Sequence, residues 1–427
     1  MRILHVVHQY VPDHVAGTEL YTQSVARRQV AAGHEAAVFT PLNRDGTFTA
    51  QPAIEDGVRV YRVPAGPRGA TAVFRSVYRQ PALAAAFETV LDVEQPDIVH
   101  VQHLMGVPAA VGAALRARAI PYIISLHDYW YACANGQLLT NFSAEVCGGP
   151  DATFSNCGRC ALARAGLPSP PALGLVVGPL LRRRNALLGP IFAAAAHVLA
   201  PNEFVRDIYG ALGFPTGHVV INPLGLDAPT DLPERLRAGR RDGPAGGLRL
   251  GYVGSISRQK GIHTLIAAIN GLPANDLTLD IYGDMAVFPD YAAELRAAAR
   301  HPGIRFNGLI SRGRLWEALA GLDALVMPTL WYEGSPAIIR EAFAAGLPVV
   351  GSALGATGSM VRDEVDGLLF AAGDAVALER ALRRLLDEPD LLPRLRAGIP
   401  PVRSVDEHVA EIAAVYAQAL AVARGHE

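Results

Sequence analysis

Short β-branched runs alternate with longer helical stretches along nearly the whole chain of 427 residues. The first run covers residues 3–7, and a loop containing Gly17 separates it from a helical stretch at 18–32. This alternation is typical of parallel sheets covered by helices. After segment 229–247, which is rich in Pro, Gly and Arg, the alternation starts again with a run at 248–253. The sequence therefore predicts an α/β protein with two doubly wound, Rossmann-like domains facing a central cleft.

The point at which the alternation starts again determines the expected domain boundaries. We expect a first domain at 1–228, a second at 229–405, and a final helix at 406–427. A cysteine-rich, irregular insert at about 128–165 interrupts the first domain. In doubly wound sheets, ligands bind beyond the carboxyl ends of the strands, so functional residues are expected on the loops there. Helices are expected at 73–91 and 180–195, among others.

The composition excludes several classes of protein. Half of the residues are hydrophobic and 18% are charged, which is enough apolar material for a core and excludes wholesale disorder. A net charge of −2 disfavours nucleic acid as a partner. No signal segment or long apolar run is evident, so a cytoplasmic protein is expected. Arg182, Arg183 and Arg184 beside LGLVVGPLL indicate either peripheral contact with the inner face of the membrane or a solvated helix end.

The strongest local signal is the segment EGSPAIIRE, from Glu333 to Glu341, directly after the apolar run ALVMPT. Ser335 is expected to cap a helix that begins at Pro336. Gly334 and Ser335 would then present backbone N–H groups at a helix N-terminus, where phosphate binds readily. Each glutamate can accept hydrogen bonds from two hydroxyl groups, so the pair suits a sugar and a ribose. The alternative on spacing alone is a capped helix with two solvated glutamates.

A second signal is the segment GYVGSISRQKG at 251–261. Arg258 and Lys260 are expected to meet phosphate oxygens there. Lys260 is the one lysine among 38 Lys and Arg residues. A compact ammonium and a planar guanidinium are not interchangeable at a tight phosphate site, so a lysine here fits a chemical demand. Chance is the alternative.

Two further residues stand at the ends of expected strands. Gly17, in AGTEL, would open space above a helix N-terminus. His127, in SLHD, ends a run at 122–127 and is expected to point toward the cleft, unless it is a core or capping histidine. The chain lacks G-x-G-x-x-G, so the fingerprint of a nicotinamide site is absent.

All four cysteines fall in the insert, and the last two form C-G-R-C. Four thiolates could hold a structural zinc, with Cys133, Cys147, Cys157 and Cys160 as ligands, although the first pair lacks the C-x2-C spacing. An iron–sulfur cluster or a redox role, and unligated thiols, remain the alternatives. Disulfides are not expected in a cytoplasmic chain. Since the insert follows His127 directly, we expect it to shape one side of the cleft.

Together these segments resemble the glycosyltransferases of family 4, which are retaining, nucleotide-sugar-dependent enzymes of the GT-B fold. AGTEL, SLHDYW, GSISRQKGIHTLI and EGSPAIIREAFAAGLPVV occur in family order and span nearly the whole chain. The resemblance implies a first domain on the acceptor side, a second that holds the donor, and a final helix at 406–427 that packs back on the first domain. We expect the insert to shape the acceptor side of the cleft. It implies transfer of a sugar from a nucleotide diphosphate sugar to a glycan, lipid-linked or small-molecule acceptor, in cell-surface glycan or glycoconjugate biosynthesis.

The resemblance also implies residue roles. Glu341 would bind the donor ribose, Glu333 the transferred sugar and Lys260 the diphosphate. Gly17 would lie against the diphosphate or the sugar, and His127 would contact the sugar near the reacting centre. Glu333 and His127 are therefore the expected catalytic residues.

One position departs from the family pattern. The family loop usually reads G-R-L-x-x-x-K-G, and here Ser255 stands in place of the arginine while Arg258 follows. Either Arg258 supplies the second charge, or Lys260 and backbone N–H groups hold the diphosphate alone. Cations aimed at a departing diphosphate stabilise its growing negative charge, and no D-x-D pair is present, so no catalytic metal is expected. A nucleotide-sugar epimerase and a non-catalytic sugar-nucleotide-binding protein are the alternative functions.

Overall fold

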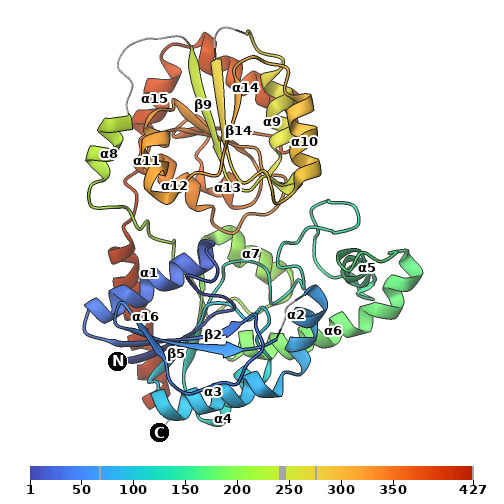
Figure 1. Ribbon diagram of the computed structural model, residues 1–427, viewed down its shortest axis with the longest axis vertical. Helices are drawn as coiled ribbons and strands as arrows, with labels where there is room; N and C mark the ends of the chain where they lie inside the picture. Colours follow the sequence, from blue (N-terminus) through green and yellow to red (C-terminus); the bar gives the residue numbers. More distant parts are fainter. Residues whose placement is uncertain (67–68, 240–246, 275–276, 426–427) are drawn as a thin grey trace. The chain divides into compact units, whose positions relative to one another are not determined.

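The computed structural model describes residues 1–66, 69–239, 247–274 and 277–425. It divides into two compact units (Figure 1): unit 1 comprises Met1–Gly225 and Val405–Glu427, and unit 2 comprises Leu226–Ser404. Of the expected connecting segment 229–247, residues 240–246 lie outside the described residues. The described part of that segment contains a helix, α8 (Leu232–Gly239).

Unit 1 is built on an eight-stranded sheet with the order β3-β4-β2-β1-β5-β6-β7-β8. β3 pairs antiparallel with β4, and the other described pairings are parallel. The central strands are buried along their whole length, as expected when helices cover both faces. The strands are β1 (Arg2–Val6), β2 (Glu35–Leu42), β3 (Ala53–Glu55), β4 (Val58–Pro64), β5 (Ile98–Val101), β6 (Tyr122–Ser125), β7 (His197–Ala200) and β8 (Val219–Ile221).

The helices of unit 1 correct three sequence predictions. The single helix expected at 73–91 is two helices, because Pro81 has no N–H to continue a helix and begins a new one. The insert expected to be irregular contains a helix, and the helix expected at 180–195 begins earlier. The helices are α1 (Gly17–Ala31), α2 (Ala70–Tyr78), α3 (Pro81–Glu94), α4 (Ala110–Ala117), α5 (Ser155–Arg164), α6 (Pro171–Ala193), α7 (Glu203–Ala211) and α16 (Val405–Arg424).

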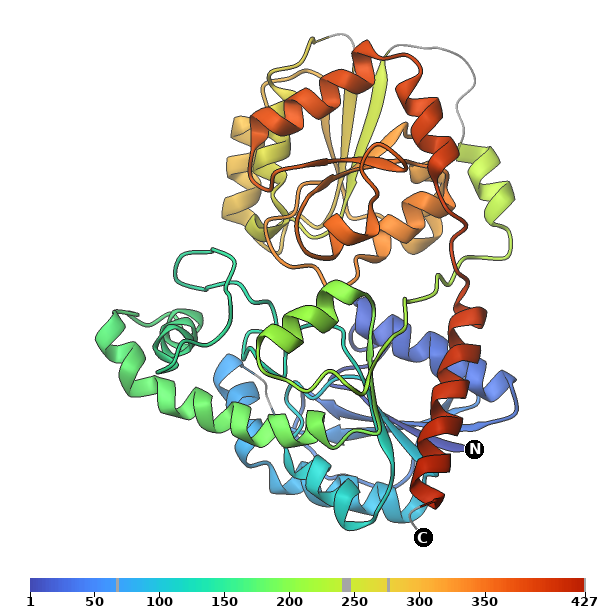
Figure 2. The same cartoon turned by 180° about the vertical axis from the view of Figure 1, so that it is seen from behind.

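The last helix, α16, packs against α1 in unit 1 although it follows the whole of unit 2 in the sequence (Figure 2). Its buried residues recur at spacings of three and four, which gives the helix one apolar face. That face packs with strand residues such as Ile3 and Ile98. Tyr416 also bonds His100 Nδ1 at 2.7 Å and accepts from Gln29 Nε2 at 3.1 Å. Hydrophobic burial and these polar contacts together fix α16 to the sheet of unit 1.

Unit 2 holds a six-stranded parallel sheet with the order β11-β10-β9-β12-β13-β14. Apolar clusters of buried residues cover it. The strands are β9 (Leu248–Val253), β10 (Leu277–Tyr282), β11 (Ile304–Gly308), β12 (Ala324–Met327), β13 (Val349–Ser352) and β14 (Gly367–Phe370). The helices besides α8 are the 3-10 helix η1 (Arg258–Lys260), α9 (Ile262–Ile269), α10 (Pro289–Ala298), α11 (Arg312–Ala320), α12 (Ala337–Ala344), α13 (Gly355–Met360), α14 (Ala375–Asp387) and α15 (Leu391–Gly398).

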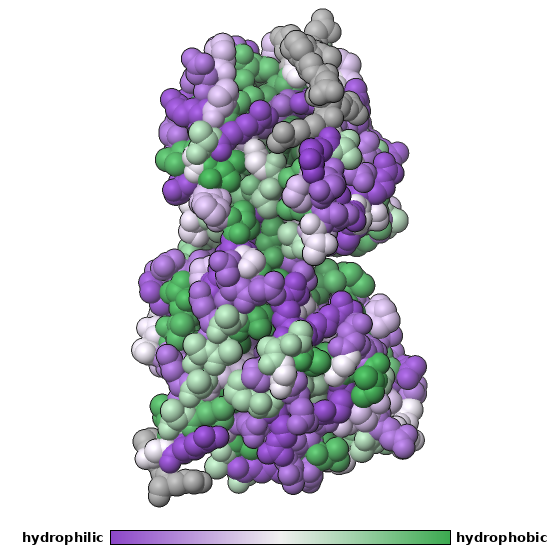
Figure 3. All heavy atoms as spheres, turned by 90° about the vertical axis from the view of Figure 1, so that its left-hand side faces the viewer, coloured by the Kyte–Doolittle hydropathy of each residue, from purple (hydrophilic) through white to green (hydrophobic). Residues whose placement is uncertain are grey.

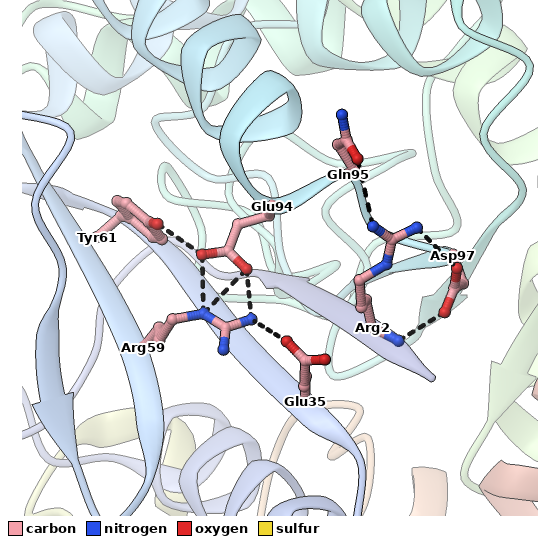
Figure 4. A network of polar contacts seen from close by, with 7 residues as sticks. All are labelled: Arg2, Glu35, Arg59, Tyr61, Glu94, Gln95 and Asp97. Atoms are coloured by element: carbon pink, nitrogen blue, oxygen red, sulfur yellow. Dashed lines mark hydrogen bonds and ion pairs between the residues drawn. The ribbon is translucent and has the colours of Figure 1, made fainter.

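A polar network ties together the strand starts in unit 1 (Figure 4). Glu94, at the end of α3, accepts hydrogen bonds from Arg59 Nη2 at 2.6 Å and from Tyr61 Oη at 2.5 Å, and its two oxygens share the Arg59 Nε hydrogen at 2.9 and 3.0 Å. Arg2, at the start of β1, pairs with Asp97 at 3.2 Å. Because parallel strands start at the same edge of a sheet, this network lies at the edge opposite the one where ligands are expected. It is a structural feature of unit 1.

The surface mixes residue types on the face drawn in Figure 3, where hydrophilic and hydrophobic residues are interspersed. Scattered surface apolar residues of this kind are ordinary in soluble domains. Among the described residues, no helix is long and apolar enough to cross a membrane.

Candidate functional site

The sheet of unit 2 has one topological switch point, between β9 and β12. From β9 the chain proceeds to β10 and β11 on one side, while β12, β13 and β14 follow on the other side. The loops that leave β9 and β12 therefore diverge, and the space between them is where doubly wound sheets bind ligands. Lys260 follows β9, and Glu333 follows β12.

Lys260 and Glu333 meet at this switch point. Lys260 Nζ lies 2.6 Å from Glu333 Oε1. The same oxygen accepts a hydrogen bond from Trp331 Nε1 at 2.8 Å and from Thr329 Oγ1 at 3.2 Å. The Glu333 side chain is 8% exposed and that of Lys260 is 21% exposed. Three donors thus hold a nearly buried carboxylate, while the ammonium keeps access to solvent.

The two loops are fixed to each other by backbone contacts. Leu330 N donates to Gln259 O at 2.8 Å. Gly261 adopts φ +70°, and a Cβ atom there would lie 1.8 Å from Pro328 O. Glycine is therefore required at position 261 by both backbone conformation and space. The close approach places η1, and with it Lys260, against the end of β12.

The helix after Glu333 differs from the prediction at its first turn. α12 begins at Ala337, so Pro336 is the cap residue rather than the first helical residue, and Ser335 does not cap it. Instead, Ser335 Oγ accepts a hydrogen bond from Arg340 Nη1 at 2.7 Å. Proline cannot supply a side-chain acceptor, which is why this cap lacks a side-chain hydrogen bond.

The remaining donor-site residues of unit 2 have partners of their own. Glu341, inside α12 and 3% exposed, bonds Arg312 Nη1 at 2.5 Å. Arg258, which was expected beside Lys260 at the phosphate, instead pairs with Glu294 of α10 and lies 5.1 Å above the Tyr291 ring. The structure therefore brings Lys260 and Glu333 together but directs Arg258 toward α10.

Unit 1 has an equivalent switch point between β1 and β5, because the chain runs from β1 to β2 on one side and from β5 to β6 on the other. Gly17 is the first residue of α1, the helix that follows β1 after the loop at 7–16. A Cβ atom at Gly17 would meet nothing within 4 Å, so the glycine leaves open space at this helix start. Gln102 follows β5, and His127 follows β6.

His127 is held as a neutral ring. Its Nε2 donates to Gln102 Oε1 at 2.9 Å, and its ring meets the edge of Tyr21 at 5.0 Å between centroids. Burial lowers the pKa of His127 to about 3; His103 reinforces the shift, and Asp128 opposes it. At neutral pH, Nε2 therefore carries the hydrogen and Nδ1 keeps a lone pair for an incoming group.

A second group of side chains at the switch point of unit 1 was not predicted from the sequence. His103 Nε2 lies 3.0 Å from Asp128 Oδ2, and the His103 ring lies 4.4 Å from that of His8. Glu19, which is 1% exposed, approaches His8 Nε2 at 3.6 Å. Burial raises the pKa of Asp128, but His103 and a backbone N–H outweigh it and keep that pKa below its ordinary value. The strand-end rule that selected His127 would also have selected His8 and His103, which follow β1 and β5.

The four cysteines line one cavity of 390 Å³ in unit 1, together with apolar side chains that include Phe74, Trp130 and Val177. All four are free thiols. Backbone N–H groups donate to two of the sulfur atoms: Asn141 N to Cys160 Sγ at 3.3 Å, and Gly149 N to Cys147 Sγ at 3.4 Å. Within the described ranges, however, no group of three or more His, Cys, Asp or Glu side chains is arranged to hold a metal ion. The zinc site formed by Cys133, Cys147, Cys157 and Cys160 is therefore not shown.

Comparisons with known proteins show which family the chain resembles in sequence. Residues 16–225 match the model of a glycosyl transferase 4-like domain, and residues 247–388 match that of glycosyl transferases group 1. The chain is 26% identical to a D-inositol 3-phosphate glycosyltransferase of Xylanimonas cellulosilytica, over 94% of this chain and 92% of that protein. It is 26% identical to a glycogen synthase of Mycobacterium tuberculosis, over 91% and 87% of the two chains.

Solved structures share the fold. A sucrose-phosphate synthase from Thermosynechococcus elongatus aligns with a TM-score of 0.72 at 20% identity, covering 98% of this chain and 99% of that one. HepE of Anabaena, solved in complex with UDP and glucose, aligns with a TM-score of 0.65 at 19% identity, also over 98% and 99%. These similarities confirm the predicted fold class, and the matched relatives are transferases rather than epimerases or binding proteins. The chain belongs to the nucleotide-sugar-dependent glycosyltransferases of the family 4 type, with the GT-B fold.

Proposed function

We propose that this glycosyltransferase binds its donor diphosphate at the switch point of unit 2 and transfers the sugar with retention of anomeric configuration. The observation that carries the proposal is the Lys260–Glu333 pair between the diverging loops of β9 and β12. Negative charge grows on the leaving diphosphate during transfer, and a positioned ammonium stabilises it without reorganising in the reaction. That HepE holds UDP and glucose supports a nucleoside diphosphate sugar as donor.

Glu333 has two roles in this proposal. It neutralises and positions Lys260 in the absence of a donor, and its carboxylate accepts hydrogen bonds from hydroxyl groups of the transferred sugar. Glu341 is proposed to accept from the ribose, with Arg312 fixing its carboxylate. Gly334 and Ser335 are proposed to offer backbone N–H groups at the start of α12. Arg258 has no direct role on the diphosphate in this account, because its guanidinium pairs with Glu294.

For unit 1, we propose that Gly17 and the neutral His127 contact the diphosphate or sugar end of the donor. The open space at Gly17 and the available Nδ1 of His127 support these roles. The acceptor is proposed to be a glycan, a lipid-linked sugar or a small molecule of surface-glycan or glycoconjugate assembly. We propose that the reaction takes place in the cytoplasm.

The structural zinc remains a prediction. It is supported by the gathering of four thiols around one cavity and by the two N–H···S contacts. Metal analysis of the purified protein, before and after a chelator, tests it. One zinc per chain is expected, with loss of stability after the metal is removed. A metal-free preparation of full activity would contradict it.

The donor proposal is tested by a thermal-shift panel of nucleotide diphosphate sugars. A ligand that binds the folded state at a hundred times its Kd stabilises it by about 2.7 kcal/mol. We expect one nucleotide class to raise the midpoint of wild-type protein and to do so less for Glu333→Gln. Product analysis with the donor alone then separates the alternatives, because a new sugar isomer without acceptor would reveal an epimerase. If no nucleotide sugar raises the midpoint, the proposal is wrong.

A further inference from the structure

A chain of polar side chains runs through unit 1 and ends at His127. His127 Nε2 lies 2.9 Å from Gln102 Oε1, and Gln102 Nε2 lies 3.1 Å from His5 Nδ1. His5 Nε2 lies in turn 2.7 Å from Gln29 Oε1. Gln29 Nε2 donates to Tyr416 Oη at 3.1 Å. These five residues, which we call the polar chain, connect α16 to His127 through α1, β1 and the end of β5.

The polar chain continues beyond Tyr416 and is closed to solvent. The Tyr416 hydroxyl lies 2.7 Å from His100 Nδ1, and His100 Nε2 lies 2.8 Å from Ser125 Oγ, at the end of β6. Water therefore has little access to replace a hydrogen bond that is lost inside the chain. The inner residues are at most 2% exposed: His5, Gln29, His100, Gln102 and Tyr416.

The hydrogen bonds of the polar chain run in one direction. Burial lowers the pKa of His5 to about 4, so at pH 7 its ring is neutral and has one N–H donor and one acceptor nitrogen. Gln102 donates to His5 Nδ1, so His5 Nε2 carries the hydrogen and donates to Gln29. His127 Nε2–H donates to the carbonyl oxygen of the same Gln102 amide. Donation thus passes from His127 toward Tyr416, and each residue fixes the role of the next.

A second consistent arrangement of the polar chain requires the reversal of every link. An amide presents one oxygen acceptor and one nitrogen donor, and a neutral imidazole presents one of each. No inner residue can turn alone without bringing two donors or two acceptors face to face. In the reversed chain, His127 Nε2 would accept from Gln102, and His127 Nδ1 would carry the hydrogen. What His127 offers to a substrate, a lone pair or an N–H, therefore depends on the direction of the whole chain.

Tyr416 determines this direction at the far end. Its oxygen accepts from Gln29, and its hydrogen is available to His100 Nδ1. Without the hydroxyl, the Gln29 N–H group would face an apolar ring edge. A buried donor without a partner is costlier than a carbonyl oxygen without one. The Gln29 amide would then be more stable when turned, and the turn would pass along the chain to His127.

The helix α16 also approaches His127 by a second route. His408 Nε2 lies 2.8 Å from Tyr21 Oη, and the Tyr21 ring meets the His127 ring edge-on at 5.0 Å between centroids. His408 is fully buried in α16. This contact restricts the plane of the His127 ring, whereas the polar chain determines which of its nitrogens carries the hydrogen.

We propose that the polar chain positions His127 for sugar transfer, with its hydrogen on Nε2 and the Nδ1 lone pair available to a hydroxyl group of the substrate. The inference rests on the proposed role of His127 toward the donor. It gives α16 a part in the active site in addition to its packing on the sheet. The positioning residues act through His127 and do not touch the substrate themselves; they are Gln102, His5, Gln29 and Tyr416.

The direct test is the tautomer of each ring, measured by long-range 1H–15N NMR on the full chain labelled with 15N-histidine. We expect Nε2–H signals for His5 and His127 in the wild type at pH 7. His301 of unit 2 is the reference for this tautomer, because Gly303 N donates to its Nδ1 at 3.0 Å. In Tyr416→Phe, we expect Nδ1–H signals of His5 and His127 to appear together.

A second variant cuts the polar chain at its other end. Gln102→Met removes the amide beside His127, so both tautomers of His127 should appear, while His5 keeps the hydrogen on Nε2 for its bond to Gln29. This variant tests the same chain independently of any change in the packing of α16.

Steady-state kinetics test whether the tautomer matters for transfer. Tyr416→Phe should lower kcat/KM about threefold, and Gln102→Met by up to about tenfold. In a His127→Gln background, Tyr416→Phe should have no further effect, because the chain no longer has a ring to position. The matched control is Tyr122→Phe, which removes a buried hydroxyl bonded to Ile191 O at 2.7 Å in the same unit. The control should change neither the tautomers nor kcat/KM.

Unchanged tautomers of His5 and His127 in folded Tyr416→Phe and Gln102→Met proteins would overturn the proposal. An equal loss of kcat/KM from Tyr416→Phe with and without His127 would also overturn it, because the tyrosine would then act independently of the histidine. If the tautomers respond as expected but His127→Gln transfers sugar at the wild-type rate, the polar chain is supported and the proposed role of His127 toward the donor is wrong.

Discussion

Units 1 and 2 share one layout but differ in the chemistry at their switch points. In unit 2, a charged pair, Lys260 and Glu333, lies between the diverging loops. In unit 1, the corresponding loops carry imidazole rings, and His127 is held without charge. The doubly wound sheet thus determines where a ligand meets the protein, while the residues after each strand determine what the site can do. The charged pair suits a diphosphate, and the neutral His127 ring suits hydroxyl groups.

The largest expected difference between the units is in catalysis. Glu333→Gln keeps the shape of the side chain but removes the charge that positions Lys260, so we expect kcat for sugar transfer to fall about a hundredfold or more. The control is Glu294→Gln, which removes the exposed partner of Arg258 and should change kcat little. Steady-state kinetics of both variants check this. Similar losses of kcat in the two variants would mean that the effect is not specific to the switch point of unit 2.

Three glycine substitutions test whether the loop after β9 is held rigidly. Gly261 lies in that loop, and Gly346 and Gly17 serve as references. Gly261→Ala should lower the free energy of unfolding by several kcal/mol, because the new Cβ meets Pro328 O and φ is +70°. Gly346→Ala, at φ +75° with open space, isolates the backbone term and should cost about 1–2 kcal/mol. Gly17→Ala should barely change stability, since nothing lies within 4 Å. Urea unfolding measures the free energy of unfolding of all three variants. Equal losses for Gly261→Ala and Gly346→Ala would show that the close approach to Pro328 O does not add to the cost.

Acid should weaken unit 1 through its buried histidines. Burial lowers the pKa of His5 to about 4 and that of His100 well below its ordinary value, and both rings are fully buried. The folded protein therefore keeps them neutral while the unfolded chain takes up protons below pH 6.5. Above pH 6.5 the two histidines do not lower the free energy of unfolding. As the pH falls below 6.5, each lowers it by about 1.4 kcal/mol per pH unit, until the folded-state pKa is reached, which is about 4 for His5.

Hydrogen exchange at pH 7 and pH 5 checks the acid effect strand by strand. Amides of β1 and β5 should lose more protection, after correction for intrinsic rates, than those of β9 and β12. A greater loss in unit 2 would contradict the assignment of the acid sensitivity to His5 and His100.

The polar network around Glu94, at the strand starts of unit 1, is expected to contribute to stability but not to catalysis. Glu94→Gln removes the carboxylate that accepts from Arg59 and Tyr61, so stability should fall by about 1–3 kcal/mol. The values of kcat and KM should stay at wild-type levels at a temperature where the variant is folded. Thermal unfolding and steady-state kinetics on one preparation measure both effects. A change in KM would show that the network at the strand starts affects substrate binding.

Of the two expected catalytic residues, His127 should give the smaller loss of activity. His127→Gln should lower kcat/KM about tenfold, which corresponds to one lost hydrogen bond to the substrate. Because the pKa of His127 is about 3, the loss should be the same at every pH from 5 to 8. If the wild type shows a pH inflection in this range that His127→Gln removes, then the ring titrates during the reaction and the neutral assignment is wrong.

The sequence predicted most of what depends on local pattern. The two α/β sheets follow from alternating runs, and the sequence placed Lys260 and Glu333 on loops that follow strands. Their contact also requires the pairing of β9 with β12, which is not a local feature. Side-chain partners were not predictable in the same way: Arg258 is two residues from Lys260, yet its direction depends on Glu294, which lies 36 residues further along the chain. His8 and His103 were missed because their proximity requires the pairing of β1 with β5. The packing of α16 on unit 1 was expected from the family resemblance, whereas the residues of the helix by themselves indicate only its apolar period.

The central claim is that Lys260 holds the diphosphate of the donor in unit 2. Calorimetric titration of the wild type, Lys260→Met and Lys260→Arg with a nucleoside diphosphate tests it most directly. We predict a Kd about tenfold to a hundredfold higher for Lys260→Met, and a partial loss for Lys260→Arg, because the broader guanidinium does not fit the same contacts. An unchanged Kd in a folded Lys260→Met protein would contradict the account.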